Sequence, residues 1–305
     1  MAKSRLFWLI LVALVAAAIL PLGVSAYIIG LLTVAYYFSV FAMSWDLLFG
    51  FAGEVNFGPT FLLGLGAYGT GILNSEYGWP LWAAMLAGTV AAVLGGVALA
   101  LPALRLRGPY FGLVTLVAVL LLQQVIVIFA GITGGEIGLT MTDVLSIDET
   151  TNYYYALFYM VVVGGILFGL SRSSVGLILQ ASGQDAIEAA ALGFNVTKHK
   201  MAAFCISALF SGLTGALLVS YLGTASVSTV VDISVGVQVI IAAVLGGRRT
   251  ILGAAFGSIF LIAMGELLRP IGELSTFVVS AMALAAILFF PDGFMGLVLR
   301  TGARQ

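Results

Sequence analysis

Four ionisable side chains stand inside or beside long apolar stretches of this sequence, where a charge is a functional candidate because lipid does not hydrate it. Glu54 lies in a glycine-rich stretch, two residues before Asn56. It is either a pathway-lining polar group or a carboxylate at the membrane edge that water and backbone amides satisfy. Asp46 is expected at the membrane interface. Glu266 and Arg269 are spaced i, i+3, so we expect them to form a structural pair at the outer rim.

The sequence contains no set of residues typical of an enzyme active site. It has no G-x-x-x-x-G-K-[ST] phosphate loop and no H-E-x-x-H motif. A single histidine and a single cysteine exclude a Cys-based metal cluster and an intrachain disulfide. A net charge of −1 excludes a strongly basic nucleic-acid binder. We therefore expect a protein that is not an enzyme and that holds no cofactor or metal of its own.

Polar residues concentrate in one segment, residues 171–200, SRSSVGLILQASGQDAIEAAALGFNVTKHK. It holds five of the chain's 25 charged residues, from totals of 12 basic and 13 acidic, and the only histidine. The spacing of its apolar residues predicts an amphipathic helix over about Leu177 to Leu192, and Gly193 offers a C-terminal stop. Such a helix would either dock into a groove on a soluble partner or rest on the membrane interface.

Composition makes lipid the solvent for most of the chain. Hydrophobic residues make up 62% of it and charged residues only 8%, against roughly 25% charged residues in a soluble domain. Ten stretches approach the ~20 apolar residues that a transmembrane helix needs. They are approximately 6–24, 27–45, 52–74, 80–102, 109–131, 153–170, 200–222, 233–247, 250–268 and 274–291. The sequence thus predicts an all-α integral membrane protein, a polytopic bundle of about ten transmembrane helices in one domain spanning residues 1–305.

The first of these stretches has a second interpretation. Lys3 and Arg5 precede an apolar run, and Val24-Ser25-Ala26 resembles a cleavage site, as in a secretory signal. Because another long apolar stretch follows at once, we favour an uncleaved first span.

The distribution of charge orients the predicted spans. Basic residues fall in gaps that ten spans place on one side: Lys3, Arg5, Arg105, Arg107, Arg172, Lys198, Lys200, Arg248, Arg249, Arg300 and Arg304. Glu76 and an acidic cluster within 136–149 fall on the other side, where Arg269 is the one basic exception. The positive-inside rule assigns the basic side to the cytoplasm. Both termini are then expected in the cytoplasm, and Arg105 and Arg107 are expected to anchor the cytoplasmic interface.

Glycine is the other distinctive residue of the chain, with 38 copies, many of them inside apolar segments. Small residues let helix backbones approach closely in lipid, so this pattern predicts a compact bundle. The region 46–60, DLLFGFAGEVNFGPT, is too broken by glycine, proline and polar residues for an ordinary lipid-facing helix. Irregular backbone at membrane depth persists only where protein or a water-filled cavity surrounds it. The broken segment therefore indicates a pathway.

Five motifs, in order along residues 45–260, resemble those of permeases in branched-chain amino acid ABC importers. They are GFAGEVNFGPTFLLGLGAY (50–68), PALRLRGPYFGLVTL (102–116), ITGGEIGL (132–139), AIEAAALGFNVTKHKMAAFCISALFSGLTGALL (186–218) and AAVLGGRRTILGAAFG (242–257). The second motif looks like the segment that marks the LivM-type subunit, and the fourth resembles the cytoplasmic coupling loop. Two departures are Arg248 and Arg249, where small or apolar residues are more usual, and Glu54, where an amide is common.

The resemblance implies a LivM-type permease of a prokaryotic cytoplasmic (inner) membrane. Its partners would be a second, homologous LivH-like permease, two cytoplasmic ATPase subunits that bind ATP and Mg²⁺, and an external substrate-binding protein. Residues 171–200 would be the coupling loop, and the residues expected to meet the ATPase are Asp185, Glu188, Ala189, Ala190 and Gly193. The residues expected near the pathway are Gly53, Glu54, Asn56 and Gly66.

Two alternatives stay open on the sequence. The cargo could be urea or a short amide in place of an amino acid, because specificity is expected to be set largely by the binding protein. The chain could also be a stand-alone secondary transporter or channel, which would show internal repeats with coupling-ion ligands at the membrane midplane. No clear pair of such repeats is visible.

Overall fold

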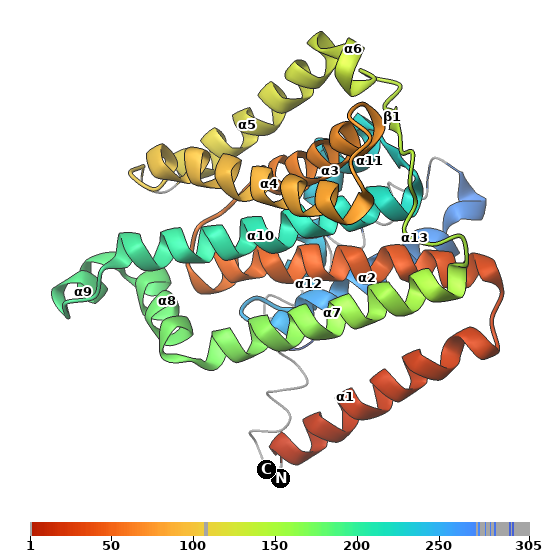
Figure 1. Cartoon of the computed structure of the whole chain (residues 1–305). Coiled ribbons are helices and arrows are strands. Elements are labelled where there is room, and N and C mark those ends of the chain that lie inside the picture. Colours follow the sequence, from red (N-terminus) through yellow and green to blue (C-terminus); the bar gives the residue numbers. More distant parts are fainter. Residues whose placement is uncertain are drawn as a thin grey trace.

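The computed structural model describes residues 2–106 and 109–272, together with the single positions 274, 278, 281, 284, 293 and 295. This part of the chain is built almost entirely of helices (Figure 1). The longer helices are α1 (Ala2–Ile19), α2 (Ala26–Asp46), α3 (Pro59–Ser75), α4 (Leu81–Ala103), α5 (Pro109–Ile128), α7 (Glu149–Arg172), α8 (Ser174–Gln184), α10 (Val196–Leu222), α12 (Ile233–Gly246) and α13 (Ile251–Leu267).

Short elements connect these helices. The short helical turns are η1 (Leu20–Leu22), the π-helical turn η2 (Leu47–Phe51), α6 (Ala130–Thr133), α9 (Ala186–Ala191), α11 (Val227–Val230) and η3 (Arg269–Ile271). Two strands, β1 (Leu139–Thr140) and β2 (Thr224–Ala225), pair antiparallel, with Leu139 opposite Ala225 and Thr140 opposite Thr224. The expected all-α architecture therefore carries one small exception, which ties the loop after α6 to the end of α10.

Within the described residues, six helical stretches are long and apolar enough to cross a membrane. They are Ala26–Phe51, Leu81–Ala103, Pro109–Ile128, Glu149–Arg172, Val196–Leu222 and Val227–Gly246, and two shorter apolar stretches are Leu11–Leu22 and Ile251–Leu267. The predicted span over 52–74 is shortened to the 17 residues of α3, because helix resumes only at Pro59. Most of the predicted span over 274–291 lies outside the described residues. The count of ten spans therefore stays a prediction.

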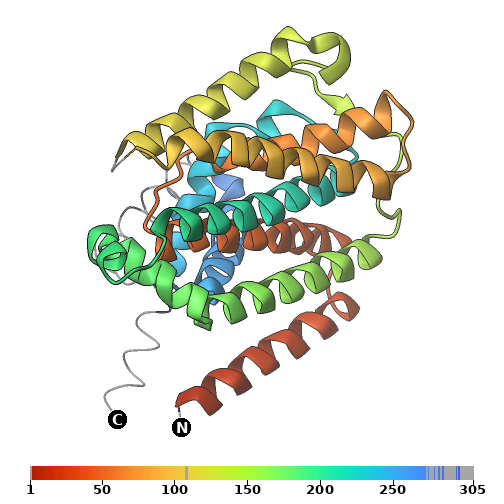
Figure 2. The same cartoon turned by 60° about the vertical axis from the view of Figure 1, so that its left-hand side comes forward.

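Helix α2 occupies the middle of the bundle. It packs against α7, α10, α12 and α13, while α3, α4 and α10 form a second tightly packed group on one side of it (Figures 1 and 2). Helix α1 lies at the margin, where hydroxyls of α7 reach its C-terminal carbonyls: Tyr153 Oη donates to Ala17 O at 2.7 Å and Tyr154 Oη to Ala18 O at 3.0 Å.

In the α3–α4–α10 group, glycine and alanine residues let the helix backbones come into contact. A Cβ placed on Gly66 of α3 would lie 2.0 Å from the carbonyl oxygen of Gly212 on α10. One placed on Gly215 would lie 2.1 Å from Leu63 O, and one on Gly212 would lie 2.3 Å from the Cβ of Ala92 on α4. These distances leave no room for side chains, so glycine permits the close packing that stabilises helices in lipid.

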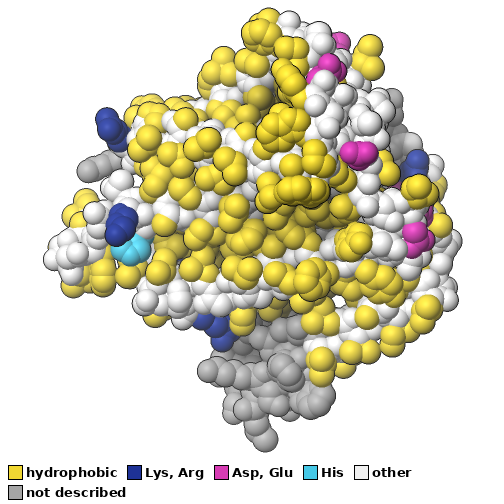
Figure 3. All heavy atoms as spheres, in the orientation of Figure 1, with side chains coloured by type: hydrophobic (Ala, Val, Ile, Leu, Met, Phe, Trp, Pro, Cys, Tyr) yellow, Lys and Arg dark blue, Asp and Glu magenta, His cyan; other side chains and the backbone are white. Residues whose placement is uncertain are grey.

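Charge is distributed unevenly along the bundle. In Figure 3 apolar side chains cover most of the visible face, while most of the visible Lys and Arg side chains lie at the end that carries α8 and α9 and the visible Asp and Glu side chains lie at the opposite end. We call the end that carries Arg105, Arg172, Lys198, Lys200, Arg248 and Arg249 the basic end. Large apolar side chains such as Leu94, Leu121 and Phe158 are exposed between the two ends, as expected of a lipid-facing surface.

The glycine contacts lead to a stability prediction. Gly66→Ala should destabilise the bundle by about 1–3 kcal/mol, the usual cost of overpacking, because the new methyl group collides with the α10 backbone. Thermal unfolding of the purified protein in detergent measures the effect. The control is Gly165→Ala on the exposed side of α7, where a Cβ meets nothing within 4 Å and alanine favours the helix. Equal melting temperatures for the two variants would contradict the close α3–α10 contact.

Candidate functional site

A cavity of about 1060 Å³ lies at the basic end and joins three segments that are distant in sequence. One wall is the irregular segment after η2, which includes Gly53 and Glu54. The second is the α4–α5 connection, which contributes Arg105. The third is the polar segment 171–200, which contributes Asp185 and Lys200 among others. The broken segment and the predicted docking segment thus meet around one cavity.

The broken segment is held by side chains because it lacks helical hydrogen bonding. Residues 53–58 carry no helix between η2 and α3. The indole Nε1 of Trp45 donates to Asn56 O at 2.7 Å, and the amide of Phe57 donates to Thr115 Oγ1 on α5 at 3.1 Å. The Asn56 side chain is buried, and its Oδ1 accepts from the amide of Gly58 at 2.9 Å. The break is therefore supported by hydrogen bonds from side chains of α2 and α5.

Glu54 forms an ion pair with Lys200 across 146 residues of sequence. Lys200 Nζ lies 2.5 Å from Glu54 Oε1, and the two side chains are only 14% and 16% exposed. Lys198 and Lys200 stand near the start of α10, which has no acidic residue in its first turn. Because the amino end of a helix disfavours cations, Glu54 supplies a negative charge that this helix lacks.

A second contact lies next to this ion pair. Gly53 has φ +72°, and a Cβ on it would lie 2.8 Å from the Cα of Gly183, near the end of α8. In return, a Cβ on Gly183 would lie 2.6 Å from Phe51 O. Glycine is required at both positions because two backbones touch there, and at Gly53 also because of its left-handed conformation.

Two helices, α8 and α9, share the region 177–192 of the polar segment, so the single helix predicted over Leu177–Leu192 is wrong. Asp185 is extended and separates α8 from α9. Its Oδ1 accepts from the amides of Ile187 at 2.8 Å and Glu188 at 3.0 Å, which caps α9. The spacing of Asp185 and Glu188 matches the acidic variant of a capping box, a sequence signal that indicates a helix start at this point.

The end of α9 is equally well defined. Gly193 adopts φ +89°, its amide donates to Ala190 O at 2.9 Å, and the amide of Phe194 donates to Ala189 O at 3.2 Å. This pair of bonds is a Schellman motif, and it agrees with the stop predicted at Gly193. Helix α9 is therefore a short helix with a cap at both ends.

The surface of α9 is largely exposed. Ile187 is 72% exposed and Leu192 is 75% exposed. Of the residues expected to meet an ATPase, Asp185, Glu188, Ala190 and Gly193 are exposed, whereas Ala189 is 2% exposed and faces the protein. Two large apolar side chains of this region therefore project from the basic end and are mostly exposed.

The predicted pathway residues divide into three groups. Gly53 and Glu54 line the cavity, Asn56 is buried beside Trp45, and Gly66 is buried in the α3–α10 contact. Arg105 lines the same cavity, whereas Arg107 lies outside the described residues.

A further polar contact lies at each end of the bundle. At the basic end, Asp46 is completely buried, its Oδ1 accepts from the amide of Arg249 at 3.3 Å, and Arg249 Nε donates to Gly50 O at 3.0 Å. Asp46 is therefore buried inside the protein at the basic end, and the membrane-interface position expected for it stays a prediction. Burial is possible because the residues after Gly247 fold back onto the end of α2.

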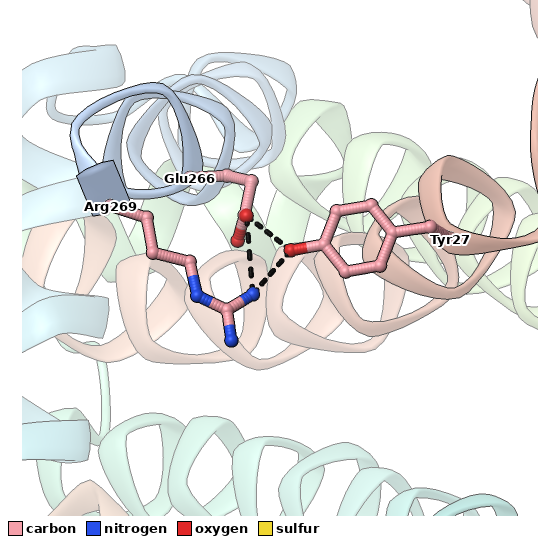
Figure 4. A network of polar contacts seen from close by, with 3 residues as sticks. All are labelled: Tyr27, Glu266 and Arg269. Carbon is pink, nitrogen blue, oxygen red and sulfur yellow. Dashed lines mark hydrogen bonds and ion pairs between the residues drawn. The ribbon is translucent and has the colours of Figure 1, made fainter.

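At the opposite end, Glu266 and Arg269 form the expected pair, with Nη1 and Oε1 3.3 Å apart. Tyr27 completes the cluster, because its hydroxyl contacts Glu266 and accepts from Arg269 at 2.5 Å (Figure 4). The cluster joins the start of α2 to the end of α13. Because the Arg269 side chain is 68% exposed, the cluster is a contact at the rim of the bundle.

Residues that the sequence interpretation missed are Lys200, as the partner of Glu54, and Gly183. The sequence carries only weak signals for them, a lysine near a helix start without a nearby acid and a lone glycine in a helical pattern. Among the described residues, no group of three or more His, Cys, Asp or Glu side chains could hold a metal ion.

Membrane-length helices, a broken segment beside a cavity and an exposed, doubly capped helix at the basic end together define a membrane permease. The family model for the branched-chain amino acid transport system permease component matches residues 27–290, and the chain belongs to this family. Similar proteins include the high-affinity branched-chain amino acid transport system permease LivM of Salmonella typhimurium and that of Escherichia coli (strain K12). Each is 26% identical over an alignment 328 residues long, which covers 96% of this chain and 75% of the relative.

A solved structure has the same fold. It is described as an inward-facing conformation of a metal-chelate type ABC transporter, and it aligns with a TM-score of 0.57 and 15% identity. The alignment covers 94% of this chain and all of the other, 100%.

The capping of α9 leads to a prediction about local stability. Asp185→Ala should weaken α9 by about 1 kcal/mol, the typical cost of losing a helix N-cap. Asp185→Asn should retain most of the cap, because an asparagine oxygen accepts the same two amide hydrogens. Hydrogen exchange at the amides of Ile187 and Glu188 measures the difference. Unchanged protection in Asp185→Ala would show that the carboxylate does not hold the helix.

Proposed function

We propose that this chain is the LivM-like half of a heterodimeric import pore for branched-chain or other amino acids. The cargo passes along a pathway that residues of both permeases line, and two separate ATPase subunits supply the energy. An external binding protein delivers the cargo. The chain itself contributes one transmembrane domain over residues 1–305, with a coupling loop at 171–200.

The observation that carries this proposal is the exposed helix α9 at the basic end. A six-residue helix has little intrinsic stability in water, yet α9 is capped at both ends and presents Ile187, Glu188 and Leu192 outward. Apolar side chains on a preformed helix suit insertion into a groove on a soluble protein. We infer that this groove belongs to an ATPase, because the chain has no phosphate loop and its family works with ATPases.

The proposed pathway ends at the cavity beside the broken segment, on the cytoplasmic side. Its walls hold Glu54 and Lys200, and its volume of about 1060 Å³ exceeds that of a single amino acid side chain many times over. The family match supports a branched-chain amino acid as the first cargo to test. The second permease would complete the pathway along its membrane-embedded part.

The proposed topology places the basic end in the cytoplasm of a prokaryotic inner membrane. The positive-inside rule supports this orientation, since six basic residues of the described chain gather at the end that carries α9. With ten spans, both termini share the cytoplasmic side.

The docking proposal predicts how α9 variants behave. Glu188→Lys should reduce ATPase association and cargo uptake by reversing a charge on the docking surface, while membrane insertion stays intact. Co-purification of the ATPases from mild detergent is the measurement. Glu136→Lys, the same charge change in an exposed loop at the opposite end, is the control and should leave ATPase association unchanged. Normal substrate-stimulated ATP hydrolysis in Glu188→Lys complexes would contradict docking.

Gly193 offers a second, conformational variant. A Cβ there meets nothing within 4 Å, so a substitution acts only through the φ of +89°. Gly193→Val should disturb the end of α9 and reduce ATPase association, whereas Gly193→Asn should retain more of it, because asparagine tolerates the left-handed conformation. Equal association in both variants would indicate that the shape of this helix end does not matter.

The orientation can be tested by labelling from either side of the membrane. In a Cys205→Ala background, Ile187→Cys (72% exposed in the wild type) should react with a membrane-impermeant maleimide only from the cytoplasmic side. Ile137→Cys, in the loop after α6 and 94% exposed in the wild type, should react only from outside. The reverse pattern would invert the topology.

A further inference from the structure

Helix α9 is anchored on both sides to two consecutive residues of the broken segment. Gly183, just before α9 in the chain, touches Gly53 through the backbone. Lys200, near the start of α10 and nine residues after the end of α9, pairs with Glu54 at 2.5 Å. The proposed docking helix therefore lies between two residues, Gly183 and Lys200, that contact the neighbouring residues 53 and 54. A displacement of α9 relative to the bundle therefore acts on residues 53 and 54, as well as on α10, which α8 and α9 also contact.

The two anchors differ in the forces they transmit. The Gly53–Gly183 contact is steric, since backbone atoms meet where no side chain fits, so it resists compression. The Glu54–Lys200 contact is attractive and mostly shielded from water, with side chains 14% and 16% exposed. Separating such a pair leaves two poorly hydrated charges, so it resists extension. Together the contacts hold α9 and the broken segment at a fixed separation.

The broken segment can pass a displacement onward. Residues 53–58 lack helical hydrogen bonds and so can change their backbone angles more readily than the helices on either side. On one side they join α2 through the Trp45–Asn56 hydrogen bond, and on the other they lead directly into α3 at Pro59. Helix α3 is in turn locked to α10 by the Gly66–Gly212 contact. A movement at Gly53 and Glu54 thus reaches the core of the bundle.

We propose that the Glu54–Lys200 ion pair, with the Gly53–Gly183 contact beside it, is the mechanical link that couples the ATPase-docking helix to the transport pathway. This inference rests on the proposed function and assigns Glu54 and Lys200 as positioning residues. They act through the backbone of residues 53–58 and hold its position relative to α9. The cargo does not need to contact them.

The test compares uptake with ATP hydrolysis in the complete transporter. The complex of both permeases and both ATPases is reconstituted in liposomes with its binding protein, and leucine serves as the probe. Glu54→Gln and Lys200→Gln should each lower the leucine imported per ATP hydrolysed by about fivefold or more, the lower end of coupling between linked sites. The leucine concentration for half-maximal uptake should stay at the wild-type value, because the cargo site is elsewhere.

Three further variants separate a coupling link from general damage. The charge swap Glu54→Lys/Lys200→Glu should recover much of the lost uptake per ATP, and Lys200→Arg should preserve it, because both keep an ion pair. Glu266→Gln, which removes a charge from the ion pair at the opposite end, should leave the ratio unchanged. Co-purification of the ATPases with every variant confirms that the complex has assembled.

Each result decides a different claim. A wild-type ratio in Glu54→Gln and Lys200→Gln would overturn the link, as would a charge swap no better than the single variants. A large rise in the leucine concentration needed for half-maximal uptake would also overturn it, because Glu54 would then belong to the cargo site. A wild-type complex without ATP-driven leucine uptake would instead overturn the proposed function on which the link rests.

Discussion

Close backbone contact between helices is the constraint on which the rest of this structure depends. In lipid, apolar side chains gain little by turning inward, so the bundle is held by packing where backbones can touch. Gly66, Gly212 and Gly215 provide that contact between α3 and α10. Because α10 begins within the polar segment and α3 begins at the end of the broken segment, this packing also fixes two walls of the cavity at the basic end.

Glycine also permits close backbone contact where the polar segment meets the bundle. Gly53 and Gly183 bring two irregular or terminal backbones together, and Glu54 and Lys200 close the contact with charge. Neither contact alone would specify the position of α9, since a steric contact permits separation and an ion pair permits rotation. Their adjacency gives a six-residue helix a defined place at the basic end. The coupling role proposed for α9 requires this combination of exposure and firm attachment.

The sequence predicts features that depend on local composition. Apolar runs located the helices, basic residues marked one end, and the pattern around Glu266 and Arg269 predicted their pairing. The order of five motifs predicted the family to which the chain belongs. These successes share a cause, because each property is carried by residues close together in sequence.

Features that depend on distant contacts were not predicted. Asp46 is buried because the chain after Gly247 returns to the end of α2, which no local pattern indicates. Lys200 pairs with a residue 146 positions away, and the two strands join the loop after α6 to the segment after α10. The division of the polar segment at Asp185 is a different error. Its capping signal was present, but the continuous apolar spacing on either side favoured one helix over two.

The central claim is that ATP hydrolysis outside this chain drives import through it, and the most direct test is uptake by the reconstituted complex. Liposomes that contain both permeases and both ATPases, supplied with the binding protein and labelled leucine, should accumulate leucine only when ATP is present on the side of the basic end. Accumulation by this chain alone, driven by a proton or sodium gradient without ATP, would contradict the account and identify a secondary transporter.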